Sequence, residues 1–157
     1  MDKTQTGLAG EFYVLAQLAH RGFVGTMTLG NTKGVDILVS NTDLNVLYKV
    51  EVKTTSQSPR LERLFGDSKF LIWAMAKKHE SISDPKLVYC FVALGDPVEM
   101  PRFFLVKSCE VSEYVKRQHE HWLRTRTKPV KDTSIRNFRI GVSDPSKYEN
   151  NWSIFEK

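Results

Sequence analysis

Three charged residues lie inside two segments that otherwise have the composition of β-strands. Asp36 lies in GVDILVS, and Glu51 and Lys53 lie two residues apart in LYKVEVKTT. Residues two apart in a strand share a face, so Glu51 and Lys53 are expected on the face opposite Val50 and Val52. The polar NTDLN between the segments predicts an antiparallel hairpin. That hairpin would bring all three charges to one side of a sheet.

Two carboxylates held close together repel each other, and a hard divalent cation relieves the repulsion. Magnesium is usually held by one or two carboxylates, water and a substrate phosphate. A neighbouring lysine could hold an attacking water or offset charge that develops on a phosphoryl group. Asp36, Glu51 and Lys53 therefore have the types needed for metal-assisted phosphodiester hydrolysis. The alternative is a solvent-facing strand edge on which Glu51 and Lys53 form an exposed ion pair of little energetic value.

The excess positive charge of the chain lies in one block. The net charge is +5, and residues 116–139 contain eight Lys/Arg and two Asp/Glu, which leaves 15 basic and 16 acidic residues elsewhere. Such a block attracts a polyanion, of which nucleic acid is the main candidate. The candidate phosphate-binding residues are Lys116, Arg117, Arg124, Arg126, Lys128, Lys131, Arg136 and Arg139. The alternatives are a solvated basic surface and, for Arg136 and Arg139, anchoring of the tail.

The elements that must position these residues follow from hydrophobic periodicity. We expect a helix over 5–21, a strand in 22–30, the hairpin over 34–55 and a loop over 55–69. A short strand leading into a helix is expected over 70–81, followed by strands over 87–94 and 102–106 and an amphipathic helix over 109–124 with Ser108 as its N-cap. The apolar run LVYCFVAL predicts a central strand covered on both faces. This order predicts an α/β fold with a mixed sheet flanked by helices.

Length and composition set the remaining bounds. The 157 residues, 41% of them hydrophobic, are expected to form a single domain with a basic C-terminal extension at about 125–157. Phe138, Ile140, Tyr148, Trp152, Ile154 and Phe155 are expected to dock that extension. No apolar run approaches the roughly 18–20 residues of a membrane span. Two cysteines cannot form a disulfide framework, which together with the absence of a leader pattern favours a cytoplasmic protein.

The segments GVD at 34–36 and EVK at 51–53, each on a predicted hairpin strand, resemble the PD-(D/E)XK nuclease superfamily, which has the restriction-endonuclease-like fold. The order of elements over about residues 5–107 is similar, and the first helix has Glu11, where many members place an acidic residue. The chain most resembles small, uncharacterised bacterial members. It departs from the motif at Val35, which stands where the superfamily has proline.

The resemblance implies a Mg²⁺-dependent nuclease acting on DNA, with Mn²⁺ as a substitute cation. Asp36 and Glu51 would bind the metal together with the Val52 carbonyl. Lys53 would position the nucleophile or stabilise the transition state, and Glu11 would orient Lys53 or hold a metal-bound water. Thr54 and Thr55 follow directly and would either touch phosphate or only end the strand. Superfamily members often dimerise to cut two strands, which leaves a homodimer open here, although the sequence shows no interface.

Two other functions are compatible with the same residues. One is a catalytically inactive nucleic-acid-binding module on this fold, and the other is an interaction protein on which Glu51 and Lys53 are merely solvated. The histidines do not favour either of these two functions. His119 and His121 would point about 200° apart on a helix and could not share a metal, and His79 is expected on the surface. Trp73 and Trp122 are expected in the core.

Overall fold

The computed structural model describes residues 2–29, 34–41, 43, 45–128, 130–143 and 147–156. The predicted strand in 22–30 and the predicted hairpin include residues outside the described ranges, namely Gly30 and parts of the 41–45 turn. The elements are α1 (Lys3–His20), β1 (Val24–Met27), β2 (Ile37–Ser40), β3 (Leu47–Thr55), β4 (Arg60–Leu61), β5 (Lys69–Ala76), the 3₁₀ turn η1 (Lys77–Glu80), β6 (Leu87–Ala93), β7 (Arg102–Lys107), α2 (Ser108–Arg124), β8 (Ile135–Gly141) and the 3₁₀ turn η2 (Trp152–Phe155).

A five-stranded mixed sheet forms the centre of the fold, in the order β1-β2-β3-β6-β7. Strands β2 and β3 pair antiparallel with Ile37 opposite Val50, so the predicted hairpin is confirmed. Strand β3 pairs in parallel with β6, and the other neighbours are antiparallel. The predicted α/β class with a mixed sheet is therefore correct.

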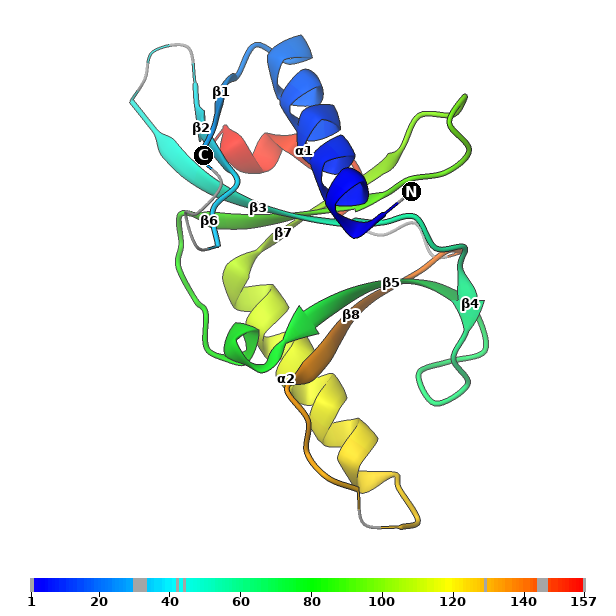
Figure 1. The fold of residues 1–157 in the computed structure, drawn as a ribbon. Helices are drawn as coiled ribbons and strands as arrows, with labels where there is room; N and C mark the ends of the chain where they lie inside the picture. The colour runs from blue at the N-terminus through cyan, green and yellow to red at the C-terminus, as the bar shows by residue number, and fades with distance from the viewer. Residues whose placement is uncertain are drawn as a thin grey trace.

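Both faces of this sheet are covered, as Figure 1 shows. All seven residues of β6 are buried, as expected for a strand with layers on both sides. Helix α1 and η2 pack on one face, where their side chains form a core with alternate residues of β2, β3 and β6. On the opposite face a second core contains residues of β5, β8 and α2, with Trp73 and Phe138 among its buried aromatics. The prediction that Trp73 lies in the core is confirmed.

The second layer differs most from the predicted elements. Strands β4, β5 and β8 form a separate three-stranded sheet, in which Trp73 of β5 lies opposite Phe138 of β8. Part of the predicted loop over 55–69 is thus strand β4, and the predicted tail contains a full strand, β8. The expected docking residues Phe138, Ile140, Trp152, Ile154 and Phe155 are all buried, and Tyr148 packs partly buried against the second core.

Two local predictions are wrong. The helix expected after the strand at 70–75 is only the four-residue 3₁₀ turn η1, because β5 continues to Ala76 and pairs with β8. Ser108 is the first residue of α2 and not its N-cap, which is Lys107. The Ser108 hydroxyl instead donates to the Asp84 carbonyl over 2.7 Å and fixes the segment that leads into β6.

Helix α1 packs closely on the end of β3. Its N-terminus has a capping box in which the Asp2 side chain accepts from Gln5 N–H. A Cβ placed on Gly10 would lie 1.9 Å from Thr54 Oγ1, so glycine is required for this approach. Among the described residues, no helix has the length and apolar character needed to cross a membrane.

Two glycines of α1 test this packing as a matched pair. Gly10→Ala is expected to lower the free energy of unfolding by about 1–3 kcal/mol, because the added methyl overlaps Thr54. Gly7→Ala is expected to raise it by about 0.5–1 kcal/mol, since a Cβ there meets nothing within 4 Å and alanine favours the helix. Urea denaturation measures both. Equal effects of the two substitutions would contradict the close approach.

Candidate active site

Asp36, Glu51 and Lys53 meet where β2 begins and β3 continues beyond it. Asp36 Oδ2 accepts a hydrogen bond of 2.7 Å from Val52 N–H, so the carboxylate reaches across to β3. Lys53 Nζ lies 2.5 Å from Glu51 Oε1. Val50 and Val52 belong to the core beneath α1, and Glu51 points to the opposite face, toward Tyr89 and η1. The strand alternation expected from the sequence is therefore what the structure shows.

Glu51 is a buried carboxylate that lies beside Lys53 and His79. Its residue is only 3% exposed, so the interpretation of Glu51 as half of a solvent-exposed pair is wrong. Burial by itself raises the pKa of Glu51, but His79 and Lys53 beside it outweigh that effect and lower the pKa to about 2. Glu51 is therefore ionised at neutral pH. Its Oε2 is buried and has no hydrogen-bond partner among the described residues.

Asp36 and Glu11 have the opposite electrostatic character. Burial and the charge of Glu51 raise the pKa of Asp36, against the lowering effects of Val52 N–H and Lys53. Burial and the charge of Asp36 raise the pKa of Glu11, which Lys53 only partly offsets. Glu11 of α1 is thus close enough to interact with both Asp36 and Lys53. The structure brings together all four residues for which the sequence predicted a catalytic role.

The oxygen atoms around this cluster suit a hard cation that takes few protein ligands and completes its coordination shell with water. A Cβ on Gly34, whose φ is +75°, would lie 3.5 Å from Glu51 Oε2, so that oxygen faces a residue without a side chain. The Val52 N–H donates toward Asp36, and the carbonyl of a strand residue points to the same edge as its N–H. Among the described residues, no group of three His, Cys, Asp or Glu side chains is arranged to hold a metal. Two carboxylates, a carbonyl and water are the set that magnesium accepts.

A polar cleft opens directly after Lys53. It has a volume of about 580 Å³ and lies between the N-terminal turns of α1, the end of β3 and strand β5. Lys3 and Arg60 line it on different elements, together with Thr54, Thr55 and Gln57. Thr54 also packs on Gly10 of α1, and the Thr55 hydroxyl accepts from Gln57 N–H over 3.3 Å, so both threonines have structural contacts.

The structure divides the basic block in two. Lys116, Arg117, Arg124, Arg126, Lys128 and Lys131 are exposed on α2 and the segment that follows it. Arg136 is only 2% exposed and pairs with Glu80 and Asp132. The Arg139 guanidinium lies 2.5 Å from Glu62 and stacks 3.8 Å from the centre of the Phe65 ring. The anchoring alternative therefore describes Arg136 and Arg139. Their charges are already paired with carboxylates of the chain, so neither is a candidate for phosphate binding.

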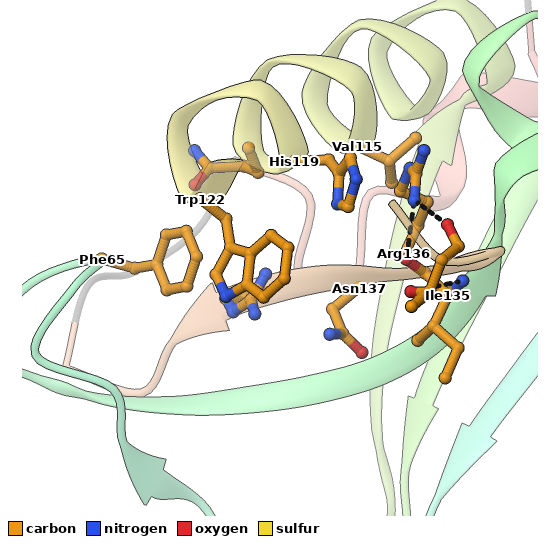
Figure 2. A pocket seen from close by; sticks show the side chains of 10 residues that line it. Phe65, Val115, His119, Trp122, Ile135, Arg136 and Asn137 are labelled. Carbon is orange, nitrogen blue, oxygen red and sulfur yellow. Dashed lines mark hydrogen bonds between the residues drawn. The ribbon is translucent and has the colours of Figure 1, made fainter. Parts of the chain in front are cut away.

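A second, more apolar pocket of about 270 Å³ lies between α2 and β8 and is shown in Figure 2. Trp122 and Phe65 lie side by side there, and His119 stacks on Trp122 with ring centres 5.4 Å apart. Trp122 thus lines a pocket and is not part of the core, contrary to expectation. His119 pairs with Asp132 at 2.8 Å, whereas His121 Nε2 lies 3.4 Å from the Leu64 carbonyl. The two histidines face different partners, as predicted.

His79 is the residue near the site that sequence reasoning missed. It was expected on the surface, but it is 3% exposed and its Nε2 lies 3.5 Å from Glu51 Oε1. Tyr89 of β6 lies beside both, and burial and the Glu51 charge raise its pKa. The continuous apolar run LVYCFVAL predicts that Tyr89 is buried, but no local pattern reveals that η1 folds over β3.

The fold is shared with a known endonuclease. No protein-family model matches the chain, and no curated protein matches it in sequence. Among solved structures, it is similar to the bacterial homing endonuclease I-Ssp6803I, with a TM-score of 0.59, 13% identity, and coverage of 99% of this chain and 92% of that chain. At this identity the likeness establishes a shared nuclease-like α/β fold.

Glu51→Gln is expected to lower the free energy of unfolding at pH 7 by about 1.5–3 kcal/mol, because Lys53 loses the charge of its buried partner. The folded pKa lies below the ordinary 4.5, so the stabilisation by Glu51 is complete above pH 4.5 and is lost as the pH falls toward about 2. Urea denaturation between pH 7 and pH 2 measures this. A constant difference between wild type and the variant over that interval would contradict it.

Asp36→Asn is expected to raise the free energy of unfolding at pH 7. The pKa of Asp36 is raised, so its ionised form destabilises the folded chain above its ordinary pKa, and the folded state is relatively favoured as the pH falls. Asparagine keeps an oxygen that can accept from Val52 N–H and removes the charge. The metal-free variant should therefore unfold at a higher urea concentration than wild type at pH 7. A lower midpoint would show that the Asp36 charge is already balanced.

Proposed function

We propose that this protein is a metal-dependent nuclease that hydrolyses DNA phosphodiester bonds, most readily as an endonuclease, and that it belongs to the PD-(D/E)XK superfamily. The observation that carries the proposal is the convergence of Asp36, Glu51, Lys53 and Glu11 at one point of the sheet. The shared fold with an endonuclease supports it. The convergence of Asp36, Glu51 and Lys53 is expected from the hairpin sequence, so that part of the argument does not depend on the likeness in fold.

Mg²⁺ is the proposed cofactor, with Mn²⁺ as a substitute. Asp36, Glu51 Oε2 and the Val52 carbonyl would hold it. When bound, the cation would lower the pKa of a water molecule and stabilise charge on a phosphoryl oxygen. Burial and the neighbouring carboxylates raise the pKa values of Asp36 and Glu11, and a cation bound between them would favour their ionised forms. The cofactor would thus offset the negative charges of Asp36 and Glu11, which Lys53 offsets only in part.

Lys53 and Glu11 would act on the water and phosphate. Lys53 Nζ has three N–H donors, and its contact with Glu51 Oε1 holds the side chain at the site. An ammonium fixed there can orient a water or stabilise the pentavalent phosphorus. Glu11 faces both Asp36 and Lys53 from α1 and could accept a hydrogen bond from a water. Each role follows from the charge and position of the side chain.

DNA would reach the site through the polar cleft. Thr54, which follows Lys53 in the chain, lines the cleft, and Lys3 and Arg60 supply positive charge on separate elements. The six exposed basic residues of 116–131 would contribute longer-range attraction for the phosphate backbone. Thr54 and Thr55 would line the path of the strand rather than specify a base. A homodimer that cuts two strands stays a prediction.

One observation favours the second candidate, a nucleic-acid-binding module without activity. The described residues contain no three-side-chain metal cluster, and Lys53 already neutralises Glu51 in part. This candidate requires salt-sensitive DNA binding with no metal binding. Calorimetric titration with Mn²⁺ separates the two functions. Heat that disappears in Glu51→Ala favours the nuclease, and an absence of heat in wild type favours the binding module.

Lys53→Ala is expected to lower the rate of plasmid cleavage with saturating Mg²⁺ by about 10²–10³-fold, because a preorganised charge at the reacting group is lost. Asp36→Ala and Glu51→Ala should abolish cleavage. Lys49→Ala is the matched control: this lysine is on the same strand, is exposed and pairs with Asp84 at 2.8 Å. Its rate should equal that of wild type. Cleavage that persists in the Lys53 and Asp36 variants would refute the proposed mechanism.

Arg126→Ala is expected to reduce DNA affinity for all sequences alike and to reduce the slope of log K against log salt by about 1, the effect of losing one phosphate contact. Lys147→Ala is the control, since this exposed lysine lies outside the basic block and pairs with Glu110 at 3.0 Å. Fluorescence anisotropy over a series of salt concentrations measures both slopes. Equal slopes for the two variants would remove the block from the DNA-binding surface.

A further inference from the structure

His79 lies where it can control the conformation of Glu51. It is on η1, which belongs to the second layer and is remote in sequence from β3. The imidazole is 3% exposed, and Nε2 lies 3.5 Å from Glu51 Oε1. That distance is longer than a standard hydrogen bond, so the contact is electrostatic. A polar ring buried this fully against a carboxylate calls for an explanation beyond packing.

The other ring nitrogen, Nδ1, lies against the backbone of Ala76. Ala76 N–H donates to His79 Nδ1 over 2.9 Å, and the Ala76 carbonyl lies at the same distance from it. When Nδ1 accepts from Ala76, the neutral ring must have its proton on Nε2. When the ring is cationic, Nε2 also has a proton. In both states Nε2 has a proton, and it lies 3.5 Å from Glu51 Oε1. A neutral ring that instead donates from Nδ1 to the Ala76 carbonyl has no proton on Nε2, and the NMR measurement described below distinguishes the two tautomers.

The position of η1 is fixed from two other elements. Arg136 of β8 pairs with the side chain of Glu80, the residue after His79. Ser112 of α2 donates to the Glu80 carbonyl over 2.6 Å. Tyr89 of β6 packs edge-on against the imidazole, with ring centres 5.8 Å apart. The contacts of Glu80 therefore fix the backbone of η1 against β8 and α2, and Tyr89 of β6 packs against the imidazole itself.

We propose that His79 is a positioning residue for Glu51: with Lys53 it holds Oε1, and it thereby leaves Oε2 directed toward Gly34 for a divalent cation. The two oxygens of Glu51 then have separate tasks. Oε1 faces Lys53 and His79, whereas Oε2 accepts no hydrogen bond from the described residues. The inference rests on the proposed function for the identity of the ligand. It assigns Arg136, through Glu80, to support of the site rather than to DNA.

The test measures Mn²⁺ binding by the electron paramagnetic resonance signal of the free ion. His79→Phe keeps an aromatic ring and removes both nitrogens, and it is expected to weaken Mn²⁺ binding about 10–100-fold, as loss of a group that orients a ligand does. His79→Gln can donate an N–H to Glu51 and should recover part of the affinity. Met75→Ala is the control for loosened packing, because Met75 is buried in the same layer on β5.

A second measurement needs no metal. Long-range proton–nitrogen NMR of the imidazole should show His79 with its proton on Nε2. A proton on Nδ1 alone overturns the inference, and so does wild-type Mn²⁺ affinity in a folded His79→Phe protein. A loss no greater than that of Met75→Ala also overturns it. If wild type binds no Mn²⁺, the proposed function falls together with the inference, whereas normal wild-type binding with an unaffected His79 variant removes the inference alone.

Discussion

The buried, ionised carboxylate of Glu51 is the constraint on which the site depends. A carboxylate that is 3% exposed is costly unless charged or polar partners surround it. Lys53 supplies one partner from the same strand, and His79 supplies another from the layer above. The second layer is therefore more than a cover for the apolar face of β6. The pairing of β5 with β8 holds η1 over β3, and so it helps to determine whether Glu51 can be charged at all.

The hairpin was predictable because its signals are local. Strand alternation places Glu51 and Lys53 on one face, and a polar turn joins β2 to β3, so neither inference needs knowledge of the rest of the chain. His79 could not be found in this way. Its burial depends on β8, which pairs with β5 at separations of 59 to 71 residues in the sequence and lies in a segment whose polar composition predicts a tail. Tertiary contacts determine that this segment forms strand β8, and they thereby determine the environment of His79.

The basic block shows the same limit. Sequence counts treat Arg136 and Arg126 alike, yet one is buried between Glu80 and Asp132 and the other is exposed with its guanidinium over Trp122. Alternation along β8 buries Arg136 and Phe138 on one face of that strand. Recognising this requires knowing that β8 is a strand. The charge of a segment thus indicates attraction for a polyanion, but only the fold separates residues that stabilise the chain from residues free to bind one.

The three carboxyl groups of the site, those of Glu51, Asp36 and Glu11, differ in the direction of their pKa shifts. The protein balances the charge of Glu51 and lowers its pKa to about 2, whereas it leaves Asp36 and Glu11 with raised pKa values. Stability alone would favour neutral residues at the latter two positions, since ionising them in the folded state is unfavourable. Burial is the main cause of these raised pKa values, and the neighbouring carboxylates add to it against the lowering effect of Lys53. Under the proposed function a divalent cation would stabilise the ionised forms, and Oε2 of Glu51, which accepts no hydrogen bond from the described residues, would be one of its ligands.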